Sequence, residues 1–239
     1  MISYVEKVDP KELENLPQNS IATRIEAMSK AYGGGFGFLD FWLQKNETET
    51  TAALCRFSGE LWLIASQTAD FEELSSFCGV IAPTVLTDTD TAQRMGLSVC
   101  NEFFEVCKHP TEGKNSVENH SLMQIYDLLT EGADGDIEIL DKKEWYADLS
   151  HRIRHQTAMA AASENAVALA GFVGQETALV TGVATRPSKR GTGEGKAVLE
   201  KLSKRLFSRT VYAEATEKTL GFYLGCGFFE SGRLVRSKT

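Results

Sequence analysis

A glycine-rich segment, Arg190-Gly191-Thr192-Gly193-Glu194-Gly195, separates an apolar run with the alternation of a strand from a run with the spacing of a helix. Its three glycines allow positive φ angles and leave no Cβ atoms in the way, so several backbone N–H groups can converge on one anion. A following helix adds the positive end of its dipole. The segment therefore predicts a phosphate-binding loop between a strand at 178–184 and a helix at 196–207.

The spacing of the glycines excludes two common phosphate loops. A dinucleotide fingerprint starting at Gly191 requires glycine at position 196, where the chain has Lys196. A Walker A loop requires glycine at position 190 and Ser or Thr at 197, where the chain has Arg190 and Ala197. The remaining pattern, R-x-x-G-x-G between a strand and a helix, resembles the acyl-coenzyme-A loop of the GNAT N-acetyltransferase superfamily.

A second segment strengthens this resemblance. Residues 222–228 read F-Y-L-G-C-G-F and resemble the F-Y-x-x-x-G-F segment that ends GNAT domains. Between the two motifs, apolar residues recur at helical spacing in 198–206 and alternate with polar ones in 211–216, as in a strand. The family's order of strand, loop, helix, strand and tyrosine-bearing helix is reproduced, and the resemblance extends from about residue 117 to the end.

The resemblance implies an α/β (α+β) fold, in which helices flank a central mixed and splayed sheet. The patterns S-x-x-Q at 121–124 and D-x-x-E at 141–144 predict the starts of two helices. Three strands are expected next, at 157–163, 166–173 and 177–185. The polar stretch 108–119 is interpreted as a linker, which predicts an N-terminal α/β domain at 1–107 and a GNAT domain at 120–239.

The N-terminal domain carries no motif to which chemistry can be attached. A β-hairpin is predicted from 51–56 and 60–66, with a helix beginning after Asp70 and a short strand at 84–87. This order is consistent with a degenerate GNAT-like half, an analogy of architecture. The glycines of 33–37 are interpreted as a loop, because no clear strand precedes them and no basic residue follows closely.

Composition and charge narrow the classes of partner. The 239 residues are 42% hydrophobic and 24% charged, as is ordinary for a globular protein. No apolar run approaches the ~20 residues of a membrane span, and the N-terminus does not resemble a signal peptide. Five cysteines without a C-x-x-C pair favour reduced thiols and a cytoplasmic location.

With 33 acidic and 25 basic residues, the net charge of −8 argues against nucleic acid or membrane partners. The charge reverses locally around the glycine-rich loop, which suits the phosphates of coenzyme A. The basic residues of this region are Arg186, Lys189, Arg190, Lys196, Lys201, Lys204 and Arg205. For Lys201, Lys204 and Arg205, a solvated helix face is the favoured interpretation.

The resemblance also implies a cofactor site. The backbone of the splayed strand, at Val183 and Thr185, is expected to face the pantetheine arm and the thioester oxygen. Thr216 stands where many relatives have an asparagine that contacts the cofactor arm. The diphosphate is expected on the loop, at Arg190, Gly191, Thr192, Gly193, Gly195 and Lys196.

Two residues are candidates for proton transfer. Tyr223 resembles the family tyrosine that protonates the departing thiolate, a role that suits a phenol protonated at neutral pH. A core aromatic is the alternative. Glu214, at the end of the strand after the loop helix, is the candidate general base, with a solvent-facing glutamate as the alternative.

A further polar cluster lies on the second predicted helix of the GNAT domain, at 151–155. His151 and His155 share a face, but no third ligand is near in sequence, so no metal site is predicted. Arg154 or His155 is a candidate contact for an acidic acceptor. A solvated helix face is the favoured interpretation.

The resemblance implies an N-acetyltransferase that transfers an acetyl group from acetyl-CoA to a primary amine by direct attack in a ternary complex. The acceptor is expected to be a small molecule or a peptide, and a homodimer is a candidate assembly. Two alternatives stay open. One is a non-catalytic acyl-CoA-binding regulatory module, and the other is an interaction protein whose loop binds another phosphate ligand.

Overall fold

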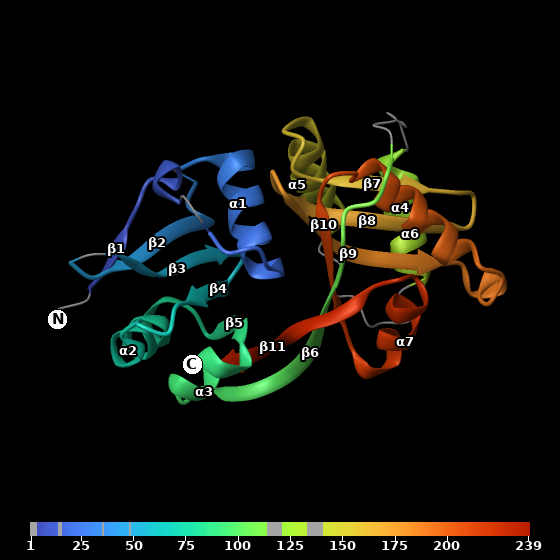
Figure 1. Cartoon of the computed structure of the whole chain (residues 1–239). Coiled ribbons are helices and arrows are strands. Elements are labelled where there is room, and N and C mark those ends of the chain that lie inside the picture. The colour runs from blue at the N-terminus through green and yellow to red at the C-terminus, as the bar shows by residue number, and fades with distance from the viewer. Residues whose placement is uncertain (1–3, 14–15, 35, 48, 114–120, 133–140) are drawn as a thin grey trace. The chain divides into compact units, whose positions relative to one another are not determined.

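The computed structural model describes residues 4–13, 16–34, 36–47, 49–113, 121–132 and 141–239, in two compact units (Figure 1). Unit 1 comprises Met1–Glu105, Ala215–Leu220 and Glu230–Thr239, and unit 2 comprises Val106–Glu214 and Gly221–Phe229. Each unit therefore combines segments from distant parts of the sequence. The predicted division at 107 and 120 remains a prediction.

Unit 1 is built on a mixed sheet in the order β1-β2-β3-β4-β5-β11-β6. The pairs β1–β2, β2–β3, β3–β4 and β5–β11 are antiparallel, whereas β4 and β5 are parallel. The elements are β1 (Tyr4–Lys7), η1 (Pro10–Glu12), α1 (Ser20–Tyr32), β2 (Leu39–Lys45), β3 (Thr50–Phe57), β4 (Glu60–Ala65), α2 (Phe71–Ile81), β5 (Thr84–Asp88), α3 (Thr89–Arg94), β6 (Ser98–Lys108) and β11 (Phe229–Lys238).

Several predictions for the first half are confirmed. β3 and β4 form the predicted hairpin, and its two turn residues, Ser58 and Gly59, have φ angles of 49° and 85°. Two consecutive positive φ angles give the turn a twist that matches the flanking strands. Asp70 caps α2, because its side chain accepts a hydrogen bond from the N–H of Glu73 at 3.0 Å.

Unit 2 contains the sheet β7–β10, in the order β10-β9-β8-β7. The pairs β7–β8 and β8–β9 are antiparallel, whereas β9 and β10, which α6 connects, are parallel. The predicted helices and strands of the second half are confirmed, with ends shifted by a few residues. They are α4 (Leu122–Gly132), α5 (Lys142–Arg154), β7 (Met159–Ala162), β8 (Ala166–Val173), β9 (Thr177–Thr185), η2 (Pro187–Lys189), α6 (Glu194–Arg205), β10 (Thr210–Ala215) and α7 (Glu217–Gly225).

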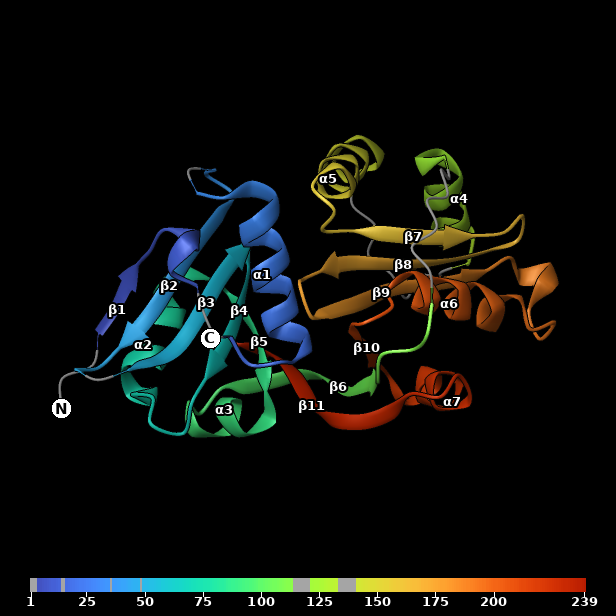
Figure 2. The same ribbon diagram turned by 45° about the horizontal axis from the view of Figure 1, so that its top comes forward.

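The core of unit 2 depends on the alternation of β8. Val167 and Leu169 join the apolar cluster that Leu128, Leu129 and Leu149 of α4 and α5 complete. Residues that alternate with them are alanines, and small side chains there leave room for α6, which also packs on β8. Figure 2 shows α4 and α5 on one side of these strands and α6 on the other.

The two halves repeat one order of elements. In the first, three antiparallel strands β2–β4 are followed by α2 and by β5, which is parallel to β4. In the second, the antiparallel strands β7–β9 are followed by α6 and by β10, which is parallel to β9. This repetition supports the analogy between the first half and a degenerate GNAT-like half.

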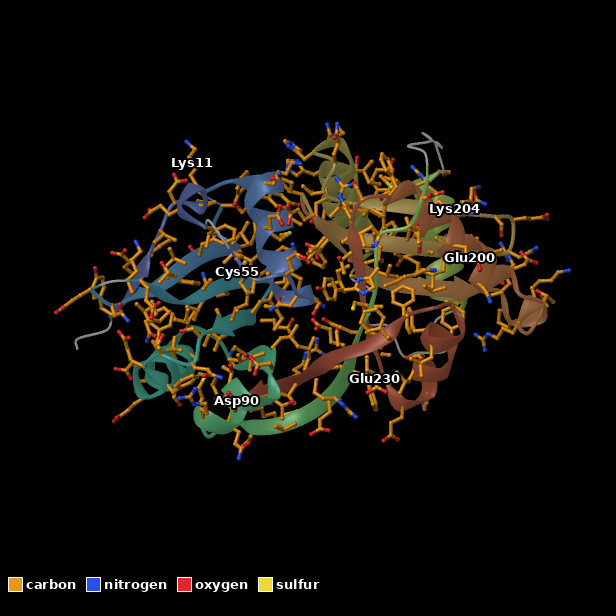
Figure 3. The ribbon with its side chains drawn as sticks, in the orientation of Figure 1. Lys11, Cys55, Asp90, Glu200, Lys204 and Glu230 are labelled. Atoms are coloured by element: carbon orange, nitrogen blue, oxygen red, sulfur yellow. The ribbon has the colours of Figure 1, made fainter. Side chains whose placement is uncertain are left out.

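All five cysteines are free, and four of them are buried. Cys55 is one of these, on β3 (Figure 3), and burial, followed by the charge of Asp40, raises the pKa of its thiol well above the usual value.

Among the described residues, no helix combines the length and apolarity that crossing a membrane requires.

A buried carboxylate accepts hydrogen bonds at the N-terminus of α1. Glu105, on β6, accepts hydrogen bonds from the N–H and the hydroxyl of Ser20, at 2.8 and 2.6 Å. Its second oxygen accepts a bond from the hydroxyl of Ser231 on β11 at 3.0 Å. An acidic group suits this position because the first N–H groups of a helix lack backbone partners and carry partial positive charge.

We expect Glu105→Ala to lower the free energy of unfolding by roughly 3 kcal/mol, because it leaves buried donors without an acceptor. Urea denaturation followed by circular dichroism measures this loss. Glu105→Gln keeps one acceptor and should cost less. The exposed Glu102 on the same strand provides the control, Glu102→Ala, and an equal loss in both alanine variants would contradict the role of Glu105.

Candidate functional site

The glycine-rich loop has the backbone that its sequence predicts. Gly191 and Gly193 have φ angles of 77° and 88°, a region that other residues rarely adopt. Gly193 is the N-cap of α6, and no side chain caps this helix end. The loop is exposed, and the hydroxyl of Thr192 donates to the carbonyl of Lys189 at 2.7 Å, which closes the turn before the helix. Its amides are thus available to an anion.

Gly195 is required by close packing. A Cβ atom at this position would lie 2.9 Å from Oγ1 of Thr185 and 3.7 Å from Cε2 of Phe222. The first distance is shorter than real Cβ contacts, so any side chain would displace its neighbours. The first turn of α6 is therefore held directly against the end of β9 and against α7.

Charged side chains of the loop are fixed by neighbouring elements. The carboxylate of Glu194 accepts hydrogen bonds at 3.2 Å from the side chains of Ser163 and Asn165, in the turn between β7 and β8. Arg190 donates to the carbonyl of Gly132, at the end of α4, at 3.0 Å. The expected contact of Arg190 with a diphosphate therefore remains a prediction, and the backbone amides are the stronger candidates.

β9 and β10 diverge next to this loop. Their parallel pairing runs from Thr177–Thr210 to Val180–Ala213. Beside this point the pairing of β8 with β9 is irregular, because Thr181 of β9 and Gly171 of β8 are both left out of the ladder, and the register is the same on either side. β9 continues to Thr185, so the predicted splay of the sheet is confirmed.

Val183 and Thr185 lie in the diverging part of β9, and both are half-buried. Along this segment β9 still pairs with β8 on its other side. On the side of β10, its backbone groups lie beyond the last pair of the parallel ladder. The arrangement provides backbone donors and acceptors along one strand edge, which an extended chain with amide groups can pair.

Tyr223 and Glu214 lie at the same splay. Glu214 directly follows Ala213, the last residue of β10 that pairs with β9. Tyr223, on α7, is buried, and its ring packs edge-to-face against those of Phe222 and Phe228 at 5.3 and 5.4 Å. The pKa of Tyr223 is raised, first by burial and then by the nearby Cys226 and Glu214.

Thr216 has a local role at the start of α7. Its carbonyl accepts hydrogen bonds from the N–H groups of Thr219 and Leu220, at 3.0 and 2.9 Å. Its own N–H donates to the hydroxyl of Thr219 at 3.0 Å. The predicted contact with the cofactor arm remains a prediction beside this capping role.

The cluster on α5 is partly structural. Arg152 pairs with Asp148 and also donates to the carbonyl of Gly171, at the irregularity in the β8–β9 ladder. The rings of His151 and His155 stack at a centroid distance of 4.3 Å. In the described residues, no group of three potential metal ligands occurs. The role of Arg154 or His155 in acceptor binding remains untested.

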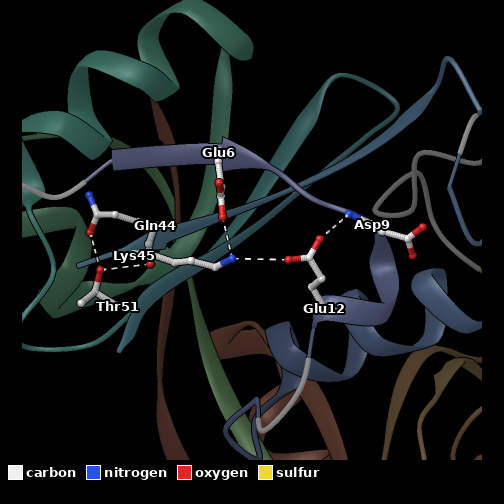
Figure 4. A network of polar contacts seen from close by, with 6 residues as sticks. All are labelled: Glu6, Asp9, Glu12, Gln44, Lys45 and Thr51. Atoms are coloured by element: carbon white, nitrogen blue, oxygen red, sulfur yellow. Dashed lines mark hydrogen bonds and ion pairs between the residues drawn. The ribbon is translucent and has the colours of Figure 1, made fainter. Parts of the chain in front are cut away.

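The equivalent loop of unit 1, between β4 and α2, contains no glycine, and its sequence is S-Q-T-A-D. The side chain of Gln44, fully buried, donates to the carbonyl of Asp70 at 3.0 Å and to Glu73 at 2.6 Å. It also accepts a bond from the N–H of Asp70 at 3.0 Å. A further bond comes from the hydroxyl of Thr51 at 2.8 Å (Figure 4). Two carboxylates thus occupy the N-terminus of α2, which makes it unsuitable for a phosphate.

Sequence reasoning missed two contacts of the site. The first is the ring of Phe222, which lies so close to Gly195 that a Cβ atom added there would be 3.7 Å from its Cε2. Lys108 donates to the carbonyl of Cys226 at 2.9 Å, at the end of the helix that carries Tyr223. Phe222 was within the recognised F-Y motif, but no sequence signal links Lys108 to a residue 118 positions away.

Comparison with known proteins identifies a domain. Residues 120–228 match the family model of the GNAT acetyltransferases. No curated protein sequence matches the chain significantly.

Solved structures resemble the chain over its whole length. A Drosophila protein has a TM-score of 0.62 at 8% identity, with 98% of each chain covered. A GCN5-related N-acetyltransferase from Sphaerobacter thermophilus has a TM-score of 0.58 at 15% identity, covering 99% of this chain and 95% of the other. A tandem GNAT protein from the clavulanic acid biosynthesis pathway has a TM-score of 0.52 at 11% identity, covering 100% and 98%. At these identities the likeness shows the fold alone, and that fold is the GNAT fold.

Proposed function

The C-terminal half of the chain belongs to the GNAT acetyltransferase family, and we propose that it transfers an acetyl group from acetyl-CoA to a primary amine. The observation that carries this proposal is the splay of β9 and β10 beside the glycine-rich loop. An exposed cradle of amides, an open strand edge and a buried tyrosine meet there. The residues present fit a thioester on a long amide-containing arm that is joined to a diphosphate.

In this proposal each part of the ligand has its own residues. The amides of Gly191, Thr192, Gly193, Gly195 and Lys196 bind the diphosphate, with the N-terminus of α6 contributing its dipole. The edge of β9 at Val183 and Thr185 pairs with the pantetheine amides. A backbone N–H of this edge donates to the thioester oxygen as it becomes negative. Acetyl-CoA supplies the acetyl group as a thioester, which an amine in the same complex attacks directly.

Two side chains move protons. The hydroxyl of Tyr223 donates its proton to the sulfur that leaves, and its raised pKa keeps the phenol neutral at physiological pH. Glu214 accepts the proton that the amine must lose, directly or through water. Both side chains lie where β9 and β10 diverge, so in this proposal the amine, the thioester and the two proton-transfer groups are oriented within one complex, which lowers the entropic cost of the reaction.

The proposal is tested by thermal unfolding with acetyl-CoA, coenzyme A, ATP and NAD. A ligand at 100 times its Kd stabilises the folded protein by about 2.7 kcal/mol. We expect stabilisation by the two coenzyme A species alone, and thiol release from acetyl-CoA when amines are supplied. Stabilisation without thiol release for any amine favours a non-catalytic acyl-CoA-binding module. An equal effect of ATP contradicts the proposed ligand.

We also propose that the chain binds one acetyl-CoA, because the N-terminus of α2 is occupied by Asp70 and Glu73. Titration calorimetry of the same protein should give one site per chain. Two sites of similar affinity would contradict the assignment of the cofactor to the C-terminal half.

A further inference from the structure

The end of α7 leaves two carbonyl groups without backbone partners. The N–H of Cys226 donates to the carbonyls of Phe222 and Tyr223, at 3.1 and 2.9 Å. The N–H of Gly227 donates to that of Leu224 at 3.0 Å. The next carbonyls along the chain, those of Gly225 and Cys226, lie past the last turn, where a helix has no N–H groups left to offer.

Two lysines from different elements bind these carbonyls. Lys196, in the first turn of α6, donates to the carbonyl of Gly225 at 3.1 Å. Lys108, the last residue of β6, donates to that of Cys226 at 2.9 Å. Positive charge is favourable here because the C-terminus of a helix carries partial negative charge. The helix that bears Tyr223 is therefore fixed at its end from two sides.

Lys108 is also linked to Tyr223 through a side chain. Its ammonium lies 5.9 Å from the centre of the Phe228 ring, within the range of a cation–π contact. The Phe228 ring in turn packs edge-to-face on the ring of Tyr223 at 5.4 Å. Between them, Gly227 has a φ of 84°, and a Cβ there would lie 3.7 Å from the ammonium. One half-buried lysine thus contacts both the end of the helix and the residue that supports the tyrosine ring.

We propose that Lys108 is a positioning residue, which holds the hydroxyl of Tyr223 in the direction of the departing sulfur. This inference rests on the proposed function, in which Tyr223 is the acid. Lys108 touches no reacting atom and acts through the carbonyl of Cys226 and the ring of Phe228. Lys196 has the same role at Gly225, but its backbone also belongs to the diphosphate loop, so Lys108 provides the cleaner test.

The test compares Lys108→Met with Lys108→Arg, alone and combined with Tyr223→Phe. Methionine keeps the apolar stem and removes the donor, whereas arginine keeps a donor. We expect Lys108→Met to lower kcat about tenfold or more, because small displacements of a catalytic group are costly. The Kd of acetyl-CoA should stay within a factor of two, and Lys108→Arg should recover part of kcat. Lys204→Met removes an exposed lysine of α6 (Figure 3) and is the matched control.

The double variant distinguishes positioning from a general loss of structure. If Lys108 acts through Tyr223, Lys108→Met should not lower kcat further once the hydroxyl is gone. An equal loss in both backgrounds, or no loss in either, would overturn the inference.

A readout independent of turnover uses NMR of ring-labelled tyrosine, with the Tyr223 signal assigned by its loss in Tyr223→Phe. We expect Lys108→Met to shift this signal and Lys204→Met to leave it in place. An unshifted signal overturns the inference even if no acceptor amine has been found. Absence of thiol release from the wild type, with the signal shifted, would instead contradict the proposed function.

Discussion

Replacing Tyr223 by phenylalanine is expected to lower kcat roughly 100-fold, the lower range for loss of a general acid. The Kd of acetyl-CoA should stay within a factor of two, because phenylalanine keeps the ring contacts with Phe222 and Phe228. Steady-state kinetics of thiol release and titration calorimetry measure the two quantities. Tyr146→Phe, at an exposed tyrosine of α5, is the control. Unchanged turnover in Tyr223→Phe would remove this residue from the acid role.

The pH dependence follows from the same residue. A phenol with its ordinary pKa near 10 would begin to lose its proton, and its acid function, as the pH approaches 10. Burial, followed by the charges of Cys226 and Glu214, raises the pKa of Tyr223, so the protonated form persists to higher pH. We expect turnover to show no loss with an apparent pKa of 10. A fall at that pH, absent in Tyr223→Phe, would mean that the ring is exposed during the reaction.

The second large effect is expected at Gly195. Gly195→Ala should weaken acetyl-CoA binding about tenfold or more, equivalent to at least about 1.4 kcal/mol. The added Cβ would lie 2.9 Å from Oγ1 of Thr185, so Thr185 or the first turn of α6 has to shift, and we expect the amides of the loop to shift with it. Titration calorimetry measures the change, and Gly79→Ala is the control, because a Cβ at Gly79 meets no atom within 4 Å.

A second substitution tests the cause of this effect. Thr185→Ala removes the atom that the new Cβ meets, while it keeps the backbone that is proposed to pair with the pantetheine arm. We expect the double variant to bind acetyl-CoA more tightly than Gly195→Ala alone. If affinity does not recover, the loss arises elsewhere in the loop, and the close approach of α6 to β9 does not explain it.

The sequence predicted local structure correctly where a residue type strongly favours one backbone conformation or one capping position. Glycine at positions 191 and 193 predicted the positive φ angles that the loop has. Asp70, followed by a helical pattern, predicted a cap, and Ser58-Gly59 predicted a tight turn; both are present. The order of elements in the second half followed from the two motifs and the apolar periodicity between them.

Roles that depend on long-range contacts could not be predicted in this way. Arg190 is predicted to lie beside a phosphate, and no local pattern predicts the hydrogen bond that its guanidinium donates to the carbonyl of Gly132. The carboxylate of Glu194, an acidic residue inside the predicted phosphate loop, accepts hydrogen bonds from Ser163 and Asn165. In each case the partner lies on another element, and no local pattern records that pairing.

What the sequence by itself determined is therefore the family of the second half and the backbone of its loop, and it proposed Tyr223 as the acid, because these depend on residue type and spacing along one short stretch. The tertiary structure decided which groups contact the helix that carries Tyr223 and which side chains bind the N-terminus of α2. Lys108 donates a hydrogen bond to the carbonyl of Cys226 at the end of α7, and Gln44 donates one to the carbonyl of Asp70 at the start of α2, only after the chain has folded. Buried backbone groups need partners, but only the packing of elements distant in sequence determines which side chain provides each one.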